Sequence, residues 1–292
     1  MFLLADGDLV VSASDLRLAA TCEFATVTAL DVTVGRAPRT EDVRDAMTRR
    51  ISELGNQHEQ RELLRLAREH PGRVVQFARP RYTRDGLVAA NDETFAALRS
   101  GAEVVVQATF FDGTFVGHAD FLELTDEGWL VCDTKLARTE SVPALLQIAA
   151  YAAQLTAAGV PTAPVARLLL GSGLITDHAL VDLLPVYRAR RARLDQMLAE
   201  HRADPGVAQW GDPRWLACGR CEDCLAAAEA ARDVLLVAGV RMPTRHKLFD
   251  AGVTTIEELA TRSLPVPGVR NAALDRIRHQ ATLQLRQDHD PD

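Results

Sequence analysis

Long hydrophobic runs are missing from this sequence of 292 residues, and so is any basic flank at its amino end. No apolar stretch reaches the roughly 18 residues that a membrane-spanning helix needs. The first ten residues, MFLLADGDLV, carry acidic residues where a secretory signal peptide would carry basic ones. Apolar residues make up 47% of the chain and charged residues 25%, which are ordinary values for a globular protein. We therefore expect a globular, cytoplasmic protein with no membrane partner.

Lysine is nearly absent, because arginine supplies almost all of the positive charge. Among 33 basic residues the only lysines are Lys135 and Lys247. A chain that uses arginine wherever a generic positive charge suffices would keep a lysine where a compact ammonium is needed, or by chance. The net charge of −7 argues mildly against a protein that coats nucleic acid through bulk electrostatics. It does not exclude an enzyme that binds phosphates through local groups of arginines.

Hydrophobic periodicity predicts an α/β core with a mixed sheet, followed by a helical tail. Asp112-Gly113 and Asp126-Glu127-Gly128 separate three β-rich runs and are hairpin signals, so these runs predict an antiparallel meander. We expect helices at 12–30, 40–70, 141–159 and 187–201, and strands at 104–111, 115–124, 129–137, 166–173 and 178–186.

Two carboxylates and one of the two lysines are expected to meet on this meander. Asp120 is expected at the end of the second strand, and Asp133 and Lys135 are two residues apart on the third. Side chains alternate along a strand, so Asp133 and Lys135 emerge on one face. Converging carboxylates repel unless a cation lies between them, and oxygen ligands suit Mg²⁺ or Mn²⁺. Lys135 would then activate a metal-bound water and stabilise charge on a phosphate. The alternative is a solvated ion pair at a sheet edge.

The order of these residues resembles the motifs of the RecB-like PD-(D/E)XK nucleases. The matching motifs are GHAD at 117–120, DTK at 133–135, and Q-x-x-x-Y formed by Gln147 and Tyr151 on the next helix. The resemblance implies a restriction-endonuclease-like fold. It also implies that Gln147 and Tyr151, which share a helix face at positions i and i+4, border the active site and hold DNA and Lys135. Without the other motifs, Tyr151 would be a core aromatic and Gln147 a surface residue.

The resemblance implies a metal site as well. Its ligands would be His58 in GNQHEQ, Asp120, Asp133 and the main-chain carbonyl of Thr134. A lone histidine is more often structural, so the argument for His58 depends on its place in the family order. Glu59 is adjacent on the same helix but would point elsewhere, and it is a weak candidate only.

Five cysteines occur, and four of them indicate a metal site. Cys218, Cys221 and Cys224 form C-x-x-C-x-x-C. Cys22 is the natural fourth ligand, because Cys132 neighbours a candidate metal-binding aspartate on a strand and should face the core. Four thiolates can hold zinc or a [4Fe–4S] cluster, and chemistry alone does not decide. One distant cysteine with a carboxy-terminal trio resembles the iron–sulfur nucleases related to RecB, including AddB and the CRISPR-adaptation nucleases. That resemblance implies a structural [4Fe–4S] cluster, with zinc as the alternative.

The tail is expected to be a small all-α domain. It resembles helix-hairpin-helix segments, in which Gly252 and Gly268 would be the hairpin glycines whose backbone amides meet DNA phosphate. A helical packing or linker domain is an equally good interpretation, because Val266-Pro267-Gly268-Val269 departs from the G-x-G pattern. We expect a nuclease domain over 1–228 and a helical hairpin domain over 229–292.

Together the motifs imply metal-dependent hydrolysis of phosphodiester bonds in DNA, on single strands or at ends, during DNA repair or processing. Residues 10–285 are similar to a group of predicted RecB-family nucleases, whose larger relatives append nuclease or helicase domains. A helicase domain or partner is therefore expected. The competing hypothesis is a non-catalytic iron–sulfur module that binds DNA within a larger helicase–nuclease.

Overall fold

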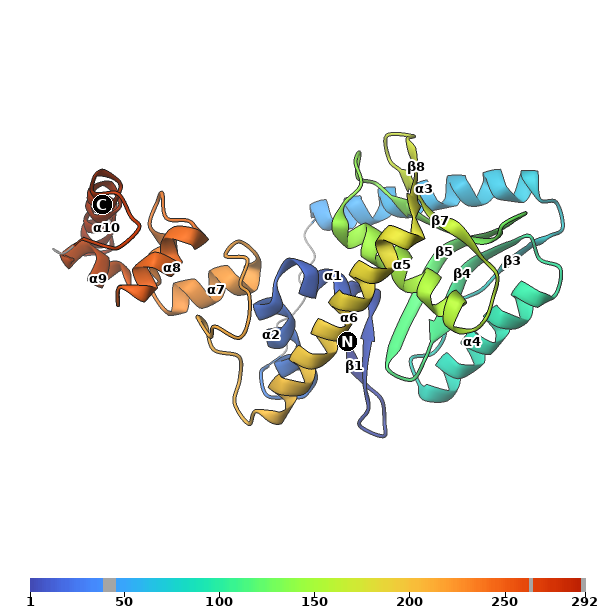
Figure 1. Ribbon diagram of the computed structural model, residues 1–292, viewed down its shortest axis with the longest axis horizontal. Helices are drawn as coiled ribbons and strands as arrows, with labels where there is room; N and C mark the ends of the chain where they lie inside the picture. The colour runs from blue at the N-terminus through green and yellow to red at the C-terminus, as the bar shows by residue number, and fades with distance from the viewer. Residues whose placement is uncertain (39–45, 263–264, 290–292) are drawn as a thin grey trace. The chain divides into compact units, whose positions relative to one another are not determined.

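The computed structural model describes residues 1–38, 46–262 and 265–289, and the chain forms two compact units (Figure 1). Unit 1 consists of Met1–Thr21 and Ala29–Pro205, and unit 2 consists of Cys22–Thr28 and Gly206–Asp292. The boundary suggested by the sequence, between residues 228 and 229, lies within unit 2 and stays a prediction about domains. In the described ranges, no helix combines the length and the apolar character that a membrane crossing requires.

Unit 1 is built around a mixed sheet. Its strands run in the order β1-β2-β5-β6-β7-β8, while β4 pairs with β5 and β3 pairs with β4. The pairs β2–β5, β3–β4 and β6–β7 are parallel, and the others are antiparallel. The strands are β1 (Phe2–Leu3), β2 (Leu9–Ser12), β3 (Val74–Gln76), β4 (Val104–Phe111), β5 (Phe115–Thr125), β6 (Gly128–Lys135), β7 (Thr162–Leu170) and β8 (Ile175–Ala179).

The predicted meander is confirmed as β4, β5 and β6, which pair antiparallel in sequence order. The expectation that Asp120 ends its strand is wrong, because Asp120 lies inside β5. On one edge of β5, β2 pairs with Phe115 and Val116, whereas β6 pairs only from Phe121 onward. Within the described chain, residues 117–120 therefore lie in a gap between two partner strands. Among the residues that the structure describes, Asp120 thus has no paired strand residue on this edge, as it would at a strand end.

Helices flank the sheet. Five of them that belong wholly to unit 1 are α1 (Ala13–Thr21), α3 (Ala46–Glu69), α4 (Arg84–Arg99), α5 (Val142–Ala157) and α6 (Leu180–Ala203), while α2 (Glu23–Thr33) has residues in both units. The predicted helix at 141–159 is α5, and its N-cap is Ser141, whose hydroxyl accepts a hydrogen bond from the Ala144 amide. The predicted helix at 40–70 is α3 from Ala46 onward, and residues 39–45 lie outside the described ranges.

The structure corrects two further assignments. The helix expected at 12–30 is two helices, α1 and α2, which are separated at Cys22. The strand expected at 178–186 ends at Ala179, and α6 begins at the next residue. Its apolar run suits a strand or a helix, and Pro185 lies inside α6 although proline removes one hydrogen bond from a helix interior.

Helix α4 was not predicted. Its N-cap Thr83 accepts a hydrogen bond from the Gly86 amide, and its buried face is formed by residues at helical spacing, Leu87, Thr94 and Leu98. Apolar residues such as Val88 and Phe95 accompany this face, so the helix carries an amphipathic pattern that the sequence analysis did not use.

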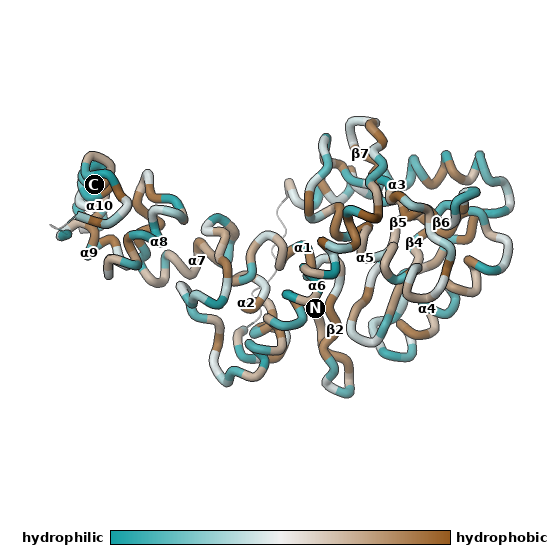
Figure 2. The backbone as a smooth tube through the Cα atoms, in the orientation of Figure 1, coloured by the Kyte–Doolittle hydropathy of each residue, from teal (hydrophilic) through white to brown (hydrophobic). Residues whose placement is uncertain are grey.

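Alternation along β6 places α3 and α5 on opposite faces of the sheet (Figure 1). Cys132 is fully buried with Leu66 of α3 and Phe121 of β5, which confirms that this cysteine faces the core. Its neighbour Asp133 faces the other way and accepts a hydrogen bond from Gln147 of α5. Figure 2 shows hydrophobic residues along α5 and the central strands and hydrophilic residues over much of α3.

Unit 2 is helical, as the sequence predicts for the tail. Its helices are α7 (Glu222–Ala230), the 3₁₀ turn η1 (Val234–Leu236), α8 (Met242–Asp250), α9 (Ile256–Thr261) and α10 (Asn271–His289). An apolar cluster that includes Leu248, Leu259 and Leu274 joins η1, α8, α9 and α10. Gly252, between α8 and α9, and Gly268, before α10, both have positive φ, which favours glycine at each turn.

Two turn glycines of the meander allow a matched stability test. Gly128 and Gly113 both have positive φ, but a Cβ on Gly128 would lie 2.6 Å from the Pro161 carbonyl oxygen, whereas one on Gly113 would meet nothing within 4 Å. We expect Gly128→Ala to lower the free energy of unfolding by roughly 1–3 kcal/mol more than Gly113→Ala. Urea denaturation of both variants measures this difference, and equal losses would contradict the expectation.

Candidate active site

The two predicted aspartates and the lysine meet on β5 and β6. Asp120 Oδ2 accepts hydrogen bonds from the amide and the hydroxyl of Thr134, at 2.8 and 2.7 Å. Asp133, whose exposed fraction is 0%, forms an ion pair with Lys135. Gln147 Nε2 donates to Asp133 Oδ1 at 3.2 Å and to the Tyr151 hydroxyl at 3.0 Å. The side chains of Asp133, Lys135, Gln147 and Tyr151 are therefore connected, and Asp120 lines one cavity with Gln147 and Tyr151.

A close approach of strand and helix makes this arrangement possible. A Cβ on Gly117 would lie 2.5 Å from the Tyr151 ring, so only glycine lets the ring lie directly against β5. The Tyr151 ring also stacks on Phe110 of β4, with centroids 6.0 Å apart. Burial raises the pKa of the Tyr151 hydroxyl, and the nearby Asp133 charge raises it further, so this group stays a neutral hydrogen-bonding partner.

The negative charges of the carboxylates repel one another. Burial raises the pKa of Asp133 from an ordinary 3.8 to about 7, and the Asp120 charge adds to this rise while Lys135 opposes it. Burial, with the Asp120 charge second, also raises the pKa of Glu59 on α3. A cation among these groups would relieve the repulsion, and an oxygen donor set of this kind suits Mg²⁺ or Mn²⁺.

The structure places His58 and Glu59 differently from the sequence expectation. His58 is buried, and its Nε2 lies 3.0 Å from the Leu169 carbonyl oxygen on β7. Leu169 is the strand partner of Thr134, so the ring lies near that part of the site but hydrogen-bonds to the main chain. Glu59, expected to point elsewhere, lines the same cavity as Asp120 and hydrogen-bonds to Gln107.

This cavity has a volume of about 370 Å³. Besides the carboxylates, its lining includes four residues that sequence reasoning missed: Arg79, Tyr82, Gln107 and His118. Gln107 lies opposite Asp120 between two paired positions of β4 and β5, and its φ of 56° is rare outside glycine. His118 precedes Asp120 by two residues, a spacing that could have identified it, whereas Arg79 and Tyr82 lie on a connecting segment without a sequence signal.

His118 is held neutral between two hydroxyl groups. Its Nε2 lies 3.0 Å from the Tyr82 hydroxyl, and its Nδ1 lies 3.1 Å from Thr109 Oγ1. Burial, together with the charge of Arg79, lowers the pKa of His118 to about 4. His118 is therefore uncharged at neutral pH and acts here as a hydrogen-bonding group.

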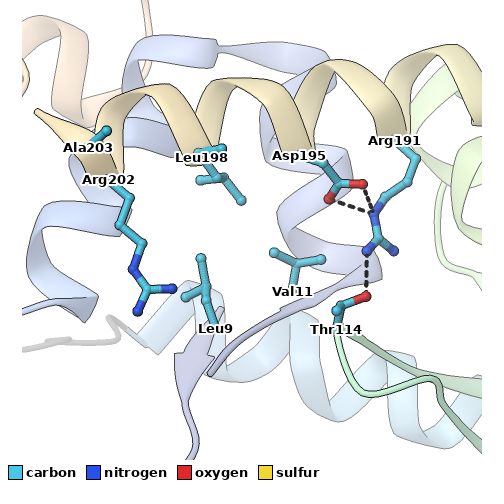
Figure 3. Close-up of a pocket in the computed structure, with 9 residues that line it drawn as sticks. Leu9, Val11, Thr114, Arg191, Asp195, Leu198, Arg202 and Ala203 are labelled. Atoms are coloured by element: carbon cyan, nitrogen blue, oxygen red, sulfur yellow. Dashed lines mark hydrogen bonds and ion pairs between the residues drawn. The ribbon is translucent and has the colours of Figure 1, made fainter. Parts of the chain in front are cut away.

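A larger cavity of about 590 Å³ lies between β2 and α6 (Figure 3). Its walls are largely aliphatic, and its two arginines are already engaged: Arg191 contacts Asp195 and Thr114, and Arg202 donates to the Gly7 carbonyl. The larger cavity offers neither paired carboxylates nor a nucleophile. The smaller cavity is therefore the better candidate for an active site.

The four predicted cysteines form a second site, which lies within unit 2. Cys22 Sγ is 3.5 Å from Cys224 Sγ and 3.8 Å from Cys221 Sγ, and Cys218 Sγ is 3.9 Å from Cys224 Sγ. All four sulfurs lie within 4.8 Å of one another. The amides of Ala25 and Cys218 donate to Cys22 Sγ, each at 3.4 Å. Four convergent sulfurs can hold a metal ion.

The thiols differ in how readily they ionise. Burial acts to raise the pKa of Cys218, but hydrogen bonds from the amides of Arg220 and Cys221 outweigh it and lower this pKa to about 7. Burial raises the pKa of Cys221 to about 11. A bound cation would be needed to keep all four sulfurs as thiolates.

Comparison with known families decides how the carboxylate site is classified. A family model described as the PD-(D/E)XK nuclease superfamily matches residues 11–228. The chain belongs to this superfamily. The match confirms the predicted restriction-endonuclease-like fold class and covers both sites described above. No curated protein matches the chain in sequence. Members of the superfamily are typically divalent-metal-dependent nucleases, so membership indicates a metal-dependent nuclease that binds nucleic acid.

The raised pKa of Asp133 predicts a pH-dependent stability in the absence of divalent metal. The folded state favours the protonated carboxyl of Asp133. The contribution of this group to the free energy of unfolding is therefore fully present below about pH 4 and is lost as pH rises through about 7. We expect Asp133→Asn to raise the free energy of unfolding in EDTA, by roughly 1–3 kcal/mol more at pH 8 than at pH 5. Thermal or urea unfolding at both pH values measures this.

The control for that experiment is Asp126→Asn, at the exposed turn between β5 and β6. Its effect should not change between the two pH values. A pH-independent effect of Asp133→Asn would show that the buried carboxyl is not destabilising when ionised.

Proposed function

We propose that this protein is a RecB-like nuclease that hydrolyses phosphodiester bonds in DNA with Mg²⁺ or Mn²⁺. The supporting observation is a fully buried carboxylate, Asp133, that is paired with the Lys135 ammonium and feels the charge of a second carboxylate, Asp120, which lines the cavity. Burying an ionised aspartate away from water costs free energy unless a cation compensates its charge. The donor set therefore fits a divalent cation better than it fits a purely structural ion pair.

Asp120, Asp133 and the Thr134 carbonyl would hold the ion. A bound Mg²⁺ or Mn²⁺ supplies Lewis-acid polarisation of the phosphate and a more acidic water. Glu59 supplies a further carboxylate from the cavity wall. The order of motifs in the family implies that His58 is a further metal ligand. To bind the ion, its ring would have to give up its contact with the Leu169 carbonyl oxygen.

The remaining residues would orient the reaction. Lys135, which already contacts Asp133, would position the attacking water and stabilise negative charge on the phosphate. Gln147 would hold Asp133 through its amide nitrogen, and its buried Oε1 has no hydrogen-bond partner within the described residues. That oxygen is available to the substrate or to a bound water. Tyr151 would fix the Gln147 side chain.

The finer assignments follow the motif resemblance. We propose that the substrate is single-stranded or end-containing DNA and that the protein acts in DNA repair or processing. A helicase domain or partner would supply the unwound strands. The hairpin glycines Gly252 and Gly268 would place backbone amides of unit 2 against DNA phosphate.

Removing the charge of Asp133 tests the proposed hydrolysis. Asp133→Asn keeps the shape of the side chain, and Lys135→Ala removes the ammonium without touching the carboxylates. We expect each variant to cleave single-stranded DNA at least about 100-fold more slowly than wild type with Mn²⁺ or Mg²⁺. EDTA should abolish wild-type cleavage, and the turn variant Asp126→Ala should cleave normally. Equal cleavage by Asp133→Asn and wild type would remove the catalytic assignment of this site, and DNA binding without cleavage by wild type would favour the non-catalytic module.

We propose that the cysteine site holds a structural metal centre, as the resemblance implies. A tetrahedral zinc ion with Zn–S bonds of about 2.3 Å separates its sulfurs by about 3.8 Å. A [4Fe–4S] cluster places an iron at each thiolate and separates the sulfurs by roughly 6 Å. The sulfur–sulfur separations of 3.5, 3.8 and 3.9 Å support zinc, whereas the [4Fe–4S] cluster would require the four cysteines to spread.

Metal analysis of anaerobically purified protein tests this assignment. We expect about one zinc per chain, a colourless protein, and loss of the metal in Cys221→Ser. Cys132→Ser is the matched control, because Cys132 is buried elsewhere in the core and should leave metal content unchanged. Iron with a broad absorption band near 400 nm would show that the larger cluster forms instead.

A further inference from the structure

The cavity of the candidate active site continues into a second cavity. The first has a volume of about 370 Å³ and the second about 450 Å³, and both are lined by Glu59, Arg79 and Gln107. The two cavities differ in chemistry. Aromatic residues line only the first, whereas the side-chain amides of Asn56, Gln60 and Gln76 line the second. A ligand that spans both would pass Glu59 and Arg79 at the junction.

Arg79 is an unused cation at that junction. It is exposed on the segment between β3 and α4, and in the described part of the chain it has no hydrogen bond or ion pair. Its charge nevertheless acts on both Glu59 and His118, so the guanidinium lies near the carboxylates. A free guanidinium beside a site that cleaves phosphodiesters is suited to a bidentate contact with a phosphate.

Tyr82 forms an aromatic platform at the mouth of the first cavity. Tyr82 is 48% exposed, and its ring packs edge-on against Phe2, with centroids 5.2 Å apart. Its hydroxyl is bound to His118, which is itself fixed by Thr109. The ring is thus held in place before any ligand arrives, and a base can stack on it at a low cost in side-chain entropy.

We propose that Arg79 and Tyr82 form a subsite for single-stranded DNA, in which an unpaired base stacks on Tyr82 and a phosphate binds Arg79. This inference rests on the proposed nuclease function and specifies its substrate. A base inside a duplex has both faces covered by its neighbours, so it cannot use the platform. The subsite therefore selects a single strand or a frayed end. The side-chain amides that line the second cavity would contact the DNA strand where it continues beyond Glu59.

The test measures binding separately from cleavage. Every protein carries Asp133→Asn, so that the DNA stays intact, and binds a fluorescein-labelled single-stranded oligonucleotide in the presence of Mg²⁺, followed by anisotropy. We expect Tyr82→Ala to weaken binding about 5-fold or more, and Tyr82→Phe, which keeps the ring, to bind nearly as well as the parent. An oligonucleotide with 2-aminopurine should show fluorescence quenching on binding that Tyr82→Ala removes.

Arg79→Ala should weaken binding and reduce the salt dependence by about one phosphate contact, a change of roughly 0.7 in the slope of log K against log salt concentration. Arg81→Ala is the matched control, because Arg81 is exposed on the same segment but lines neither cavity. It should bind as the parent does.

Two results separate this inference from the proposed function. Loss of binding in Tyr82→Ala and Arg79→Ala would support the subsite even if the wild-type protein cleaved no DNA. Metal-dependent cleavage by wild type, with unchanged binding and quenching in both variants, would overturn the subsite and leave the nuclease assignment intact. Equal affinity of the parent for duplex and single strand would also overturn it.

Discussion

The burial of one carboxylate is the constraint around which unit 1 is arranged. Asp133 has no solvent contact, so each of its interactions must come from the fold: Lys135 two residues along the strand, Gln147 from α5, and a neighbouring aspartate that repels it. Those interactions fix where α5 must lie relative to β6. They also create an electrostatic demand that a divalent cation satisfies, which links the stability of the fold to the chemistry of the site.

Much of this site could be predicted from the sequence, because its key residues are close together along regular strands. Alternation alone places Cys132 in the core and Asp133 and Lys135 on the opposite face. The helix spacing of four residues places Gln147 and Tyr151 together. These rules depend only on local geometry, so they hold without knowledge of the tertiary structure.

Other features depend on contacts between distant segments, and the sequence carries little sign of them. The gap beside Asp120 exists because β2 and β6 pair with different parts of β5. The orientations of His58 and Glu59 depend on how α3 lies on the sheet, which helical periodicity does not determine. Arg79 and Tyr82 lie on an irregular segment and reach the cavity only through the tertiary fold. Helix α4 is different, because its amphipathic pattern is present in the sequence and was not used.

The divided pairing of β5 has a structural consequence for the walls of the cavity. In the described structure, strand β2 is joined to β5 through two residue pairs, Val11–Phe115 and Ser12–Val116, and the residues that follow, Ala13 and Ser14, line the cavity of the candidate active site. This short ribbon is therefore a wall of the site rather than a source of reacting groups. Its removal would leave every proposed metal ligand in the chain and would open one side of the cavity, so the shape of the cavity depends on this short stretch of paired strand.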